Sequence, residues 1–209
     1  RSAGRSATAA AAYRSASHIE DHRTGLSFDY RARGGVDHVE ILAPAHAPEW
    51  AQDRAALWNA VEAAETRKNS QVAREIRVAL PAELDHGQRV ELVRDFCQRQ
   101  FVDRGMVADI ALHAPGREGD DRNHHAHILL TTREIAAEGF TTKNRDWNAV
   151  EVLEGWREAW AQDANLALEL AGHGERIDHR TLEAQRIEAL ELAHVAQEQG
   201  HEAEALEHT

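Results

Sequence analysis

Apolar residues recur along this 209-residue chain with two distinct periods, and these periods predict both strands and helices. Short apolar segments bounded by proline predict strands over residues 36–42 and 73–80. Recurrence at every third or fourth residue predicts longer helices, which cover residues 48–68, 84–103 and 147–171. Helical and extended segments therefore alternate along the chain.

Both ends of the chain carry further helix signals. Ser6 is a favourable N-cap in front of a run of alanines, so we expect a short helix over residues 6–17 that carries Tyr13. Thr181 is placed to cap a last helix that extends into an acidic tail. Gly172, a usual residue at a helix C-terminus, is expected to end the helix that precedes it.

The middle of the chain predicts two strands joined as a hairpin. Residues 106–113 are mostly apolar, residues 123–130 end in an aliphatic run, and glycine, proline and charged residues fill 114–124 between them. Such a connection is typical of antiparallel pairing. A polar loop is expected next, through Gly139 and Lys143. The order favours an α+β fold, with a mainly antiparallel sheet flanked by helices and a C-terminal helical tail, over a doubly wound one.

Three histidines of this hairpin form a candidate metal site. His125 and His127 alternate along one strand, so their side chains project from the same face. Antiparallel pairing brings His113, at the end of the preceding strand, beside them. Three imidazoles that leave one position open are typical of a catalytic metal centre. The chain contains 14 histidines, so a surface feature without a metal is the alternative, and the spacing names neither metal nor reaction.

Composition narrows the class of protein. A chain of 209 residues can hold one sizeable domain with a helical appendage. No apolar run approaches the roughly 20 residues that a membrane span requires, and no signal peptide is visible. The single cysteine, Cys97, excludes an intrachain disulfide. Together these features indicate a cytoplasmic protein.

The charge is strongly acidic but unevenly distributed. The net charge of −12 argues against a general nucleic-acid binder, whose affinity depends on neutralising phosphates. However, residues 1–34 carry six arginines and only three acidic residues, whereas residues 187–209 carry six glutamates and no lysine or arginine. Any phosphate-binding face is therefore expected to draw on the N-terminal segment.

Four separated segments together resemble one protein family. They occur in the family's order and roughly at its spacing, over about residues 1–187, and this agreement is more specific than any single segment. The segments are RSAGRSATAAAAYRSA, AREIRVALP, NHHAHILLTTR and GERIDHRTLEAQ. The chain resembles the MobA/MobL family of plasmid relaxases.

The resemblance implies a fold, an activity and a cofactor. The family has an antiparallel sheet flanked by helices, with a histidine–hydrophobe–histidine strand that binds a divalent metal. Its members nick one strand of DNA at a plasmid transfer origin by tyrosine attack, form a 5′-phosphotyrosyl adduct and can religate the strand. For this chain the resemblance implies Mg²⁺ or Mn²⁺, with Zn²⁺ as the alternative. It also implies single-stranded DNA as substrate, accessory relaxosome proteins and a conjugative secretion system as partners, and translocation into a recipient cell.

The family's functional residues correspond to definite positions here. The tyrosine of the opening helix is Tyr13, and the acidic residue before the ALP segment is Glu75, which would orient a histidine or act as a base. Relatives often have a second acidic residue two places later, where this chain has Arg77. The metal-binding histidines correspond to His113, His125 and His127.

The resemblance also suggests DNA contacts and a division of the chain. We expect Arg1, Arg5 and Arg14 to contact backbone phosphates near the nick, with solvated arginines as the alternative. The nicking domain is expected over residues 1–187, followed by an acidic helical tail over residues 188–209. Relatives usually begin with a short apolar strand before the RS-G-RS loop, so we expect one strand of the sheet to be missing from this sequence.

Three other functions remain open at this point. A rolling-circle replication initiator shares the metal site and tyrosine chemistry, but the matches outside the histidines disfavour it. A non-catalytic DNA-binding or metal-stabilised module needs no nucleophile, and a hydrolase that uses water needs no tyrosine. Residues 178–185 are interpreted as a local cap and salt bridge, with DNA binding as the alternative. The five tryptophans are interpreted mainly as core residues rather than platforms for bases.

Overall fold

The computed structural model describes residues 6–67, 69–116 and 120–190 of the chain. The chain divides into two compact units, residues 1–176 and residues 177–209. The predicted boundary after residue 187 stays a prediction, since residues 191–209 lie outside the described part. None of the helices in the described ranges has the length and apolar character that crossing a bilayer requires.

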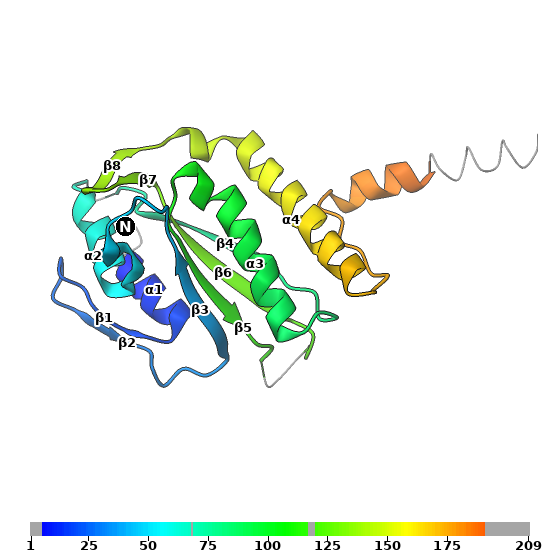
Figure 1. Cartoon of the computed structure of the whole chain (residues 1–209), viewed down its shortest axis with the longest axis horizontal. Helices are drawn as coiled ribbons and strands as arrows, with labels where there is room; N and C mark the ends of the chain where they lie inside the picture. The colour runs from blue at the N-terminus through cyan, green and yellow to red at the C-terminus, as the bar shows by residue number, and fades with distance from the viewer. Residues whose placement is uncertain (1–5, 68, 117–119, 191–209) are drawn as a thin grey trace, which may run out of the picture. The chain divides into compact units, whose positions relative to one another are not determined.

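A four-stranded antiparallel sheet forms the centre of the first unit (Figure 1). The strand order is β3-β5-β6-β4, and every pair of neighbours is antiparallel. The predicted hairpin is confirmed as the two central strands, β5 and β6. The strands are β3 (Val36–Leu42), β4 (Ala73–Ala79), β5 (Ala108–His113) and β6 (His125–Thr131).

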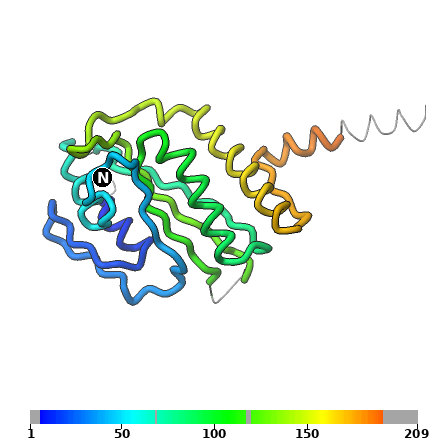
Figure 2. The backbone as a smooth tube through the Cα atoms, viewed as in Figure 1, coloured from blue at the N-terminus to red at the C-terminus, as the bar shows by residue number. Residues whose placement is uncertain are grey.

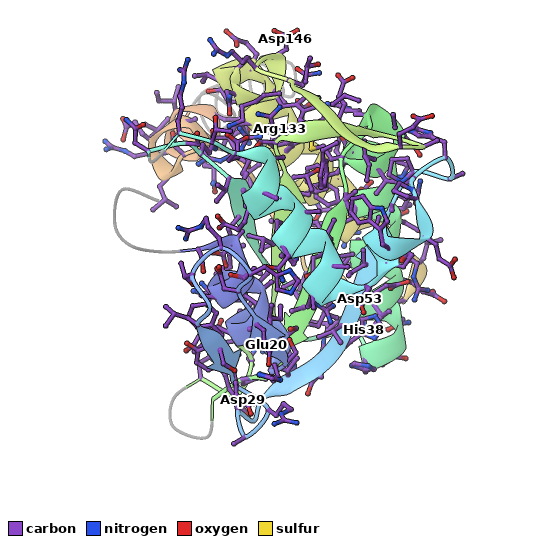
Figure 3. The ribbon with its side chains drawn as sticks, turned by 90° about the vertical axis from the view of Figure 1, so that its left-hand side faces the viewer. Glu20, Asp29, His38, Asp53, Arg133 and Asp146 are labelled. Carbon is purple, nitrogen blue, oxygen red and sulfur yellow. The ribbon has the colours of Figure 1, made fainter. Side chains whose placement is uncertain are left out.

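Helices cover both faces of this sheet. On one face lie α1 (Ala7–Ser15) and α2 (Arg54–Ala64), which pack side by side in front of the strands in Figure 3, where Asp53 marks the start of α2. On the other face lies α3 (His86–Gln100), with α4 (Val150–Leu170) packed against it. The tube in Figure 2 follows the chain from the first layer through the strands to α4. The α+β fold expected from the sequence is confirmed.

Aromatic side chains fill the space between α3 and α4. Phe96 and Phe101 contact Trp160 and Trp156 edge to face, with ring centroids 5.1 and 5.0 Å apart. Such pairs add about 0.5–1.5 kcal/mol to the stabilisation that apolar burial gives. Four of the five tryptophans are buried, as predicted, whereas Trp50 is only half-buried.

Helix ends follow local sequence signals. Ser6 accepts a hydrogen bond from the Ala9 amide, which confirms it as the N-cap of α1. The segment predicted as one helix over residues 48–68 is shorter: a 3₁₀ turn, η1 (Glu49–Gln52), precedes α2, and the Asp53 side chain caps the helix. The predicted helix over 84–103 likewise ends in a 3₁₀ turn, η2 (Val102–Arg104).

The C-terminal part of the chain also agrees with its local signals. The helix predicted over residues 147–171 consists of the 3₁₀ turn η3 (Asp146–Asn148) and α4, and Gly172 follows with a φ of 82°. In the second unit a helix covers residues 182–190, and the Thr181 hydroxyl accepts a hydrogen bond from the Ala184 amide. The last helix and its predicted cap are therefore confirmed as far as residue 190.

Two short hairpins were not predicted. The first joins β1 (His18–Glu20) to β2 (Ser27–Asp29), and Figure 3 shows Glu20 and Asp29 on it beside α1. The second joins β7 (Arg133–Ala136) to β8 (Gly139–Lys143), so the expectation of a polar loop there was wrong. Strands of three to five residues show too few alternations to establish a period. Gly139, with a φ of 124°, allows the tight turn of the second hairpin.

Candidate metal centre

The three histidines meet on the sheet face that carries α1 and α2. The register pairs His113 directly with His125, and His127 pairs with Ala111 one step along the same face. One ring nitrogen from each histidine can be chosen so that all three lie within 4.8 Å of one another. His113 and His127 are buried, with 3% and 7% of their surface exposed, and His125 is half-buried.

Each imidazole forms a hydrogen bond through one of its ring nitrogens. The acceptors are two backbone carbonyls and one carboxylate, none of which can donate, so each of these nitrogens carries the hydrogen. The hydrogen bonds run from His113 Nε2 to the Arg14 carbonyl (2.8 Å), from His125 Nδ1 to the Asn123 carbonyl (3.0 Å), and from His127 Nδ1 to Glu75 Oε1 (2.6 Å). These bonds fix the tautomers and leave one lone pair on each ring free for a cation.

Burial keeps two of the rings neutral. Desolvation lowers the pKa of His113 to about 4, and desolvation also lowers the pKa of His125. At neutral pH both rings are therefore unprotonated, which is the form that binds a metal. The burial that disfavours charge on the imidazoles thus prepares them as ligands.

Glu75 connects the histidines to α1. Its carboxylate accepts the His127 hydrogen bond and forms an ion pair with Arg14, with Nε 2.7 Å from Oε1. The hydrogen bond from His127, helped by Arg14, lowers the pKa of Glu75 to about 2 against the opposing effect of partial burial. A carboxylate that is ionised and already engaged in this way is suited to orient His127 rather than to accept a proton in a reaction.

The three rings border an open cleft of about 520 Å³. The other side chains that line it are charged: Arg14, Arg33, Glu75 and Arg77. A set of three imidazoles fits a divalent transition metal, because imidazole suits such ions whereas Mg²⁺ prefers oxygen ligands. The donor set and the anchored tautomers therefore fit a metal centre with an open side.

Tyr13 lies next to this cleft. It is the residue before Arg14 in α1, and the Arg14 carbonyl is the acceptor that holds His113. The guanidinium of Arg33, which lines the cleft, lies 4.3 Å from the centroid of the Tyr13 ring and donates a hydrogen bond to the Tyr13 carbonyl (3.0 Å). Tyr30 contacts the same ring edge to face, with centroids 5.2 Å apart, and Tyr13 remains 41% exposed.

Of the three arginines predicted to bind DNA, only Arg14 lies within the described residues. Arg14 lines the cleft, but its guanidinium is engaged by Glu75. Arg1 and Arg5 lie outside the described residues. Within the second unit, Arg180 pairs with Asp178 and Glu188, which agrees with the interpretation of residues 178–185 as a local salt bridge and cap.

Sequence reasoning overlooked two residues of the cleft as functional candidates. Arg77 was noted only as a departure from the family pattern, although it lies two places after Glu75 and must share its face of the strand. Arg33 precedes β3 in a segment without periodicity, and the sequence indicated it only as one of the six arginines of residues 1–34.

Comparison with known proteins shows the family of this chain. The profile of the MobA/MobL family matches residues 5–208, which is nearly the whole chain. The chain belongs to the MobA/MobL family. The resemblance found in the four sequence segments is thereby confirmed.

Individual MobA/MobL relatives are named for mobilisation and conjugal transfer. "Mobilization protein MobL" of Acidithiobacillus ferridurans is 39% identical over 231 residues, covering 93% of this chain and 59% of that protein. "Probable conjugal transfer protein TraA" of Sinorhizobium fredii is 37% identical over 227 residues, covering 93% of this chain. The chain spans only 20% of the latter's length, so both relatives are considerably longer.

A solved structure shares both fold and sequence with this chain. It is titled "Molecular Basis of Vancomycin Resistance Transfer in Staphylococcus aureus", and it superposes with a TM-score of 0.78 at 37% identity. The match covers 86% of this chain and 93% of that one. The solved structure therefore shares the fold of this chain, an antiparallel sheet flanked by helices.

Proposed function

We propose that this chain is the DNA-nicking domain of a conjugative relaxase, extending over about residues 1–187 as the sequence predicts. The observation that carries the proposal is the shared anchoring of two functional groups. Tyr13 and Arg14 are consecutive residues at the end of α1, and the Arg14 carbonyl holds His113. One turn of helix therefore fixes the nucleophile and orients a metal ligand.

A divalent ion would be held by His113, His125 and His127, which can each offer one ring nitrogen within 4.8 Å of the others. When bound, such an ion polarises a phosphodiester through its oxygens and offsets the charge that develops in the transition state. Glu75 orients His127, and Arg14 orients Glu75. Because the donors are imidazoles, we propose that Mn²⁺ or another transition ion binds more tightly than Mg²⁺.

Tyr13 would act as the nucleophile. Its phenol oxygen forms a bond to phosphorus, and the bond from phosphorus to the 3′ oxygen breaks. The phenol proton passes to water, and the leaving 3′ oxygen takes up a proton from water. The product is a 5′-phosphotyrosyl link and a free 3′ hydroxyl. Because one phosphodiester replaces another, the reverse attack by the 3′ hydroxyl reseals the strand. Positioning of the attacking group accounts for much of such a rate enhancement, and α1 supplies it through its contacts with the sheet.

The substrate we propose is single-stranded DNA at a plasmid transfer origin. The names of the longer relatives support this, since they refer to mobilisation and conjugal transfer. Accessory relaxosome proteins, a conjugative secretion system and action in the bacterial cytoplasm follow from the same assignment. Arg1 and Arg5 remain proposed phosphate contacts, whereas Arg14 is proposed chiefly to position Glu75.

The decisive experiment compares the two tyrosines. The protein that contains this chain is incubated with Mn²⁺ and a cognate transfer-origin oligonucleotide, and a covalent adduct is sought on a denaturing gel. Tyr13→Phe is expected to abolish the adduct. Tyr30→Phe, the matched control on the other ring of the pair, is expected to retain it. EDTA is expected to prevent cleavage by the unaltered protein and by Tyr30→Phe.

Other outcomes would favour the alternatives. Cleavage that survives Tyr13→Phe would identify water as the nucleophile and contradict the proposal. Cleavage that is insensitive to EDTA would contradict the metal assignment of the three histidines. Binding without cleavage by the unaltered protein would favour a non-catalytic DNA-binding module.

A further inference from the structure

The charges of the cleft are arranged across the sheet, not gathered at one point. The three histidines stand on β5 and β6, the two central strands. Arg77 is on β4, which forms one edge of the sheet, and Arg33 lies just before β3, which forms the other edge (Figure 1). Both arginines line the same cleft as the histidines. The trio is thus flanked by one guanidinium on each side.

Arg77 is available to bind a ligand. It pairs across the strands with His127, so its side chain projects from the same face as that metal-ligand candidate. The side chain is exposed, and among the described residues it makes no ion pair or hydrogen bond. An exposed guanidinium without a partner, on the same face as a cation site, has its N–H donors and its charge free to bind an anion such as a phosphate.

Arg33 is held, but only in part. One of its terminal nitrogens donates to the Tyr13 carbonyl, and the guanidinium lies over the Tyr13 ring. A guanidinium carries five N–H groups, so this arrangement leaves others for a phosphate. In the part of the chain that the structure describes, no carboxylate forms an ion pair with it. Arg33 therefore connects the tyrosine to the open side of the cleft.

The geometry points to a path for the DNA backbone, and this inference rests on the proposed function. We propose that the single strand crosses the sheet between the β3 edge and the β4 edge, with its 5′ side at β4. Arg33 binds the scissile phosphate beside Tyr13. Arg77 binds the next phosphate on the 5′ side, which belongs to the segment that leaves with the 3′ hydroxyl.

The direction of the strand follows from the chemistry of phosphoryl transfer. The attacking and leaving oxygens lie roughly in line on opposite sides of phosphorus. Tyr13 is on the Arg33 side of the histidines, as its ring and carbonyl contacts show. The leaving 3′ oxygen is then directed away from Arg33, toward β4 and Arg77. The segment upstream of the nick consequently passes over Arg77.

This path also explains how an acidic protein can hold DNA. The net charge of the chain is −12, yet the cleft is lined by three arginines and one glutamate. Because Arg14 and Glu75 largely neutralise each other, Arg33 and Arg77 supply the excess positive charge. Few phosphates would be neutralised in the cleft, so most sequence discrimination must come from contacts elsewhere on the protein.

The first test measures binding without cleavage. A fluorescent transfer-origin oligonucleotide is titrated with the protein in EDTA over a range of KCl concentrations. For single strands, each lost phosphate contact reduces the slope of log K against log salt by about 0.7. Arg33→Gln and Arg77→Gln are each expected to show that reduction, and Arg77→Lys is expected to restore the slope. Arg157→Gln, at an exposed position on α4, is the matched control and is expected to keep the original slope.

The second test locates each contact. Oligonucleotides carrying one neutral methylphosphonate are compared on each variant. Neutralising the phosphate 5′ to the scissile one should weaken binding to the unaltered protein but not to Arg77→Gln. Neutralising the scissile phosphate should weaken binding to the unaltered protein but not to Arg33→Gln. Thermal melting of each variant checks that the fold is intact.

The outcomes distinguish a failure of the proposed DNA path from a failure of the proposed nicking function. If the unaltered protein forms the tyrosine adduct while Arg77→Gln keeps the full salt slope, the path is wrong and the nicking function stands. Coupling of Arg77 to a phosphate on the 3′ side of the nick would likewise overturn the path. If the unaltered protein forms no adduct with its cognate oligonucleotide, the proposed function fails and the path fails with it.

Discussion

Two carboxylates at the same level of the central sheet have opposite surroundings. Asp109 on β5 and Glu75 on β4 both pair with Leu129, which lies between them on β6. Both side chains project toward the layer of α1 and α2, and each accepts hydrogen bonds from an arginine and from a ring N–H. Asp109 accepts them from Arg54 and the Trp58 indole, whereas Glu75 accepts them from Arg14 and the His127 imidazole.

Burial distinguishes the two groups. The Asp109 side chain is 5% exposed, and desolvation raises its pKa even though Arg54 and Trp58 favour the charged form. The Glu75 side chain is 33% exposed, and the hydrogen bond from His127 lowers its pKa to about 2. The two carboxylates therefore have similar partners but different roles. Asp109 links α2 to the sheet, whereas Glu75 orients His127, a metal-ligand candidate. The comparison teaches that access to solvent, not the type of partner, separates a structural carboxylate from a functional one.

The largest effect is expected from breaking the buried pair. Arg54→Met removes the cation and leaves Asp109 buried without its charge partner, which should lower the free energy of unfolding by about 3–5 kcal/mol. Arg14→Met is the matched change at the exposed pair and should cost only about 0–1 kcal/mol. Urea unfolding of both variants, followed by circular dichroism, measures the two losses. Equal losses would show that the difference in burial does not matter as argued.

A smaller effect is expected on metal binding, and here the change at Glu75 should matter more than the change at Asp109. Glu75→Gln weakens the acceptor that orients His127, so affinity for Mn²⁺ should fall about 10- to 100-fold, as is usual when the partner of a ligating histidine is changed. Asp109→Asn, compared at a temperature where it remains folded, should leave the Mn²⁺ affinity unchanged. Isothermal titration calorimetry gives both constants. An equal loss of affinity in the two variants would indicate that Glu75 acts only through general stability.

The role of Glu75 could be predicted from the sequence, whereas the role of Asp109 could not, and the reason is physical. Glu75 could be assigned from the family resemblance, and alternation along β4 places Arg77 on its face. Asp109 gave no signal, because its partners Arg54 and Trp58 come from a helix more than 50 residues away. Contacts between distant segments depend on how helices pack, and no local period encodes that packing.

The same distinction applies to the candidate site. The three histidines were predicted because pairing within one hairpin is a local property, and the structure brings them together. The carbonyl that holds His113 belongs to Arg14, 99 residues away in sequence, and only the tertiary fold reveals it. Arg33 is another case, since its contact with Tyr13 depends on how the loop before β3 returns to α1.

The smallest effect concerns the pH dependence of stability, and its sign should differ between the two carboxylates. The pKa of Glu75 falls from 4.5 to about 2 on folding, so its stabilising contribution is complete above pH 4.5 and is lost as the pH falls toward 2. The pKa of Asp109 is raised from 3.8, so its contribution is complete below pH 3.8 and is lost as the pH rises above that value. Unfolding free energies of the unaltered protein, Glu75→Gln and Asp109→Asn, measured by urea titration between pH 2 and 6, isolate each contribution by difference. Because Glu75 is partly exposed, we expect its term to stay below about 1 kcal/mol. A difference of the same sign for both variants would mean that Arg54 and Trp58 outweigh the desolvation of Asp109, and that the two sites differ less than their burial suggests.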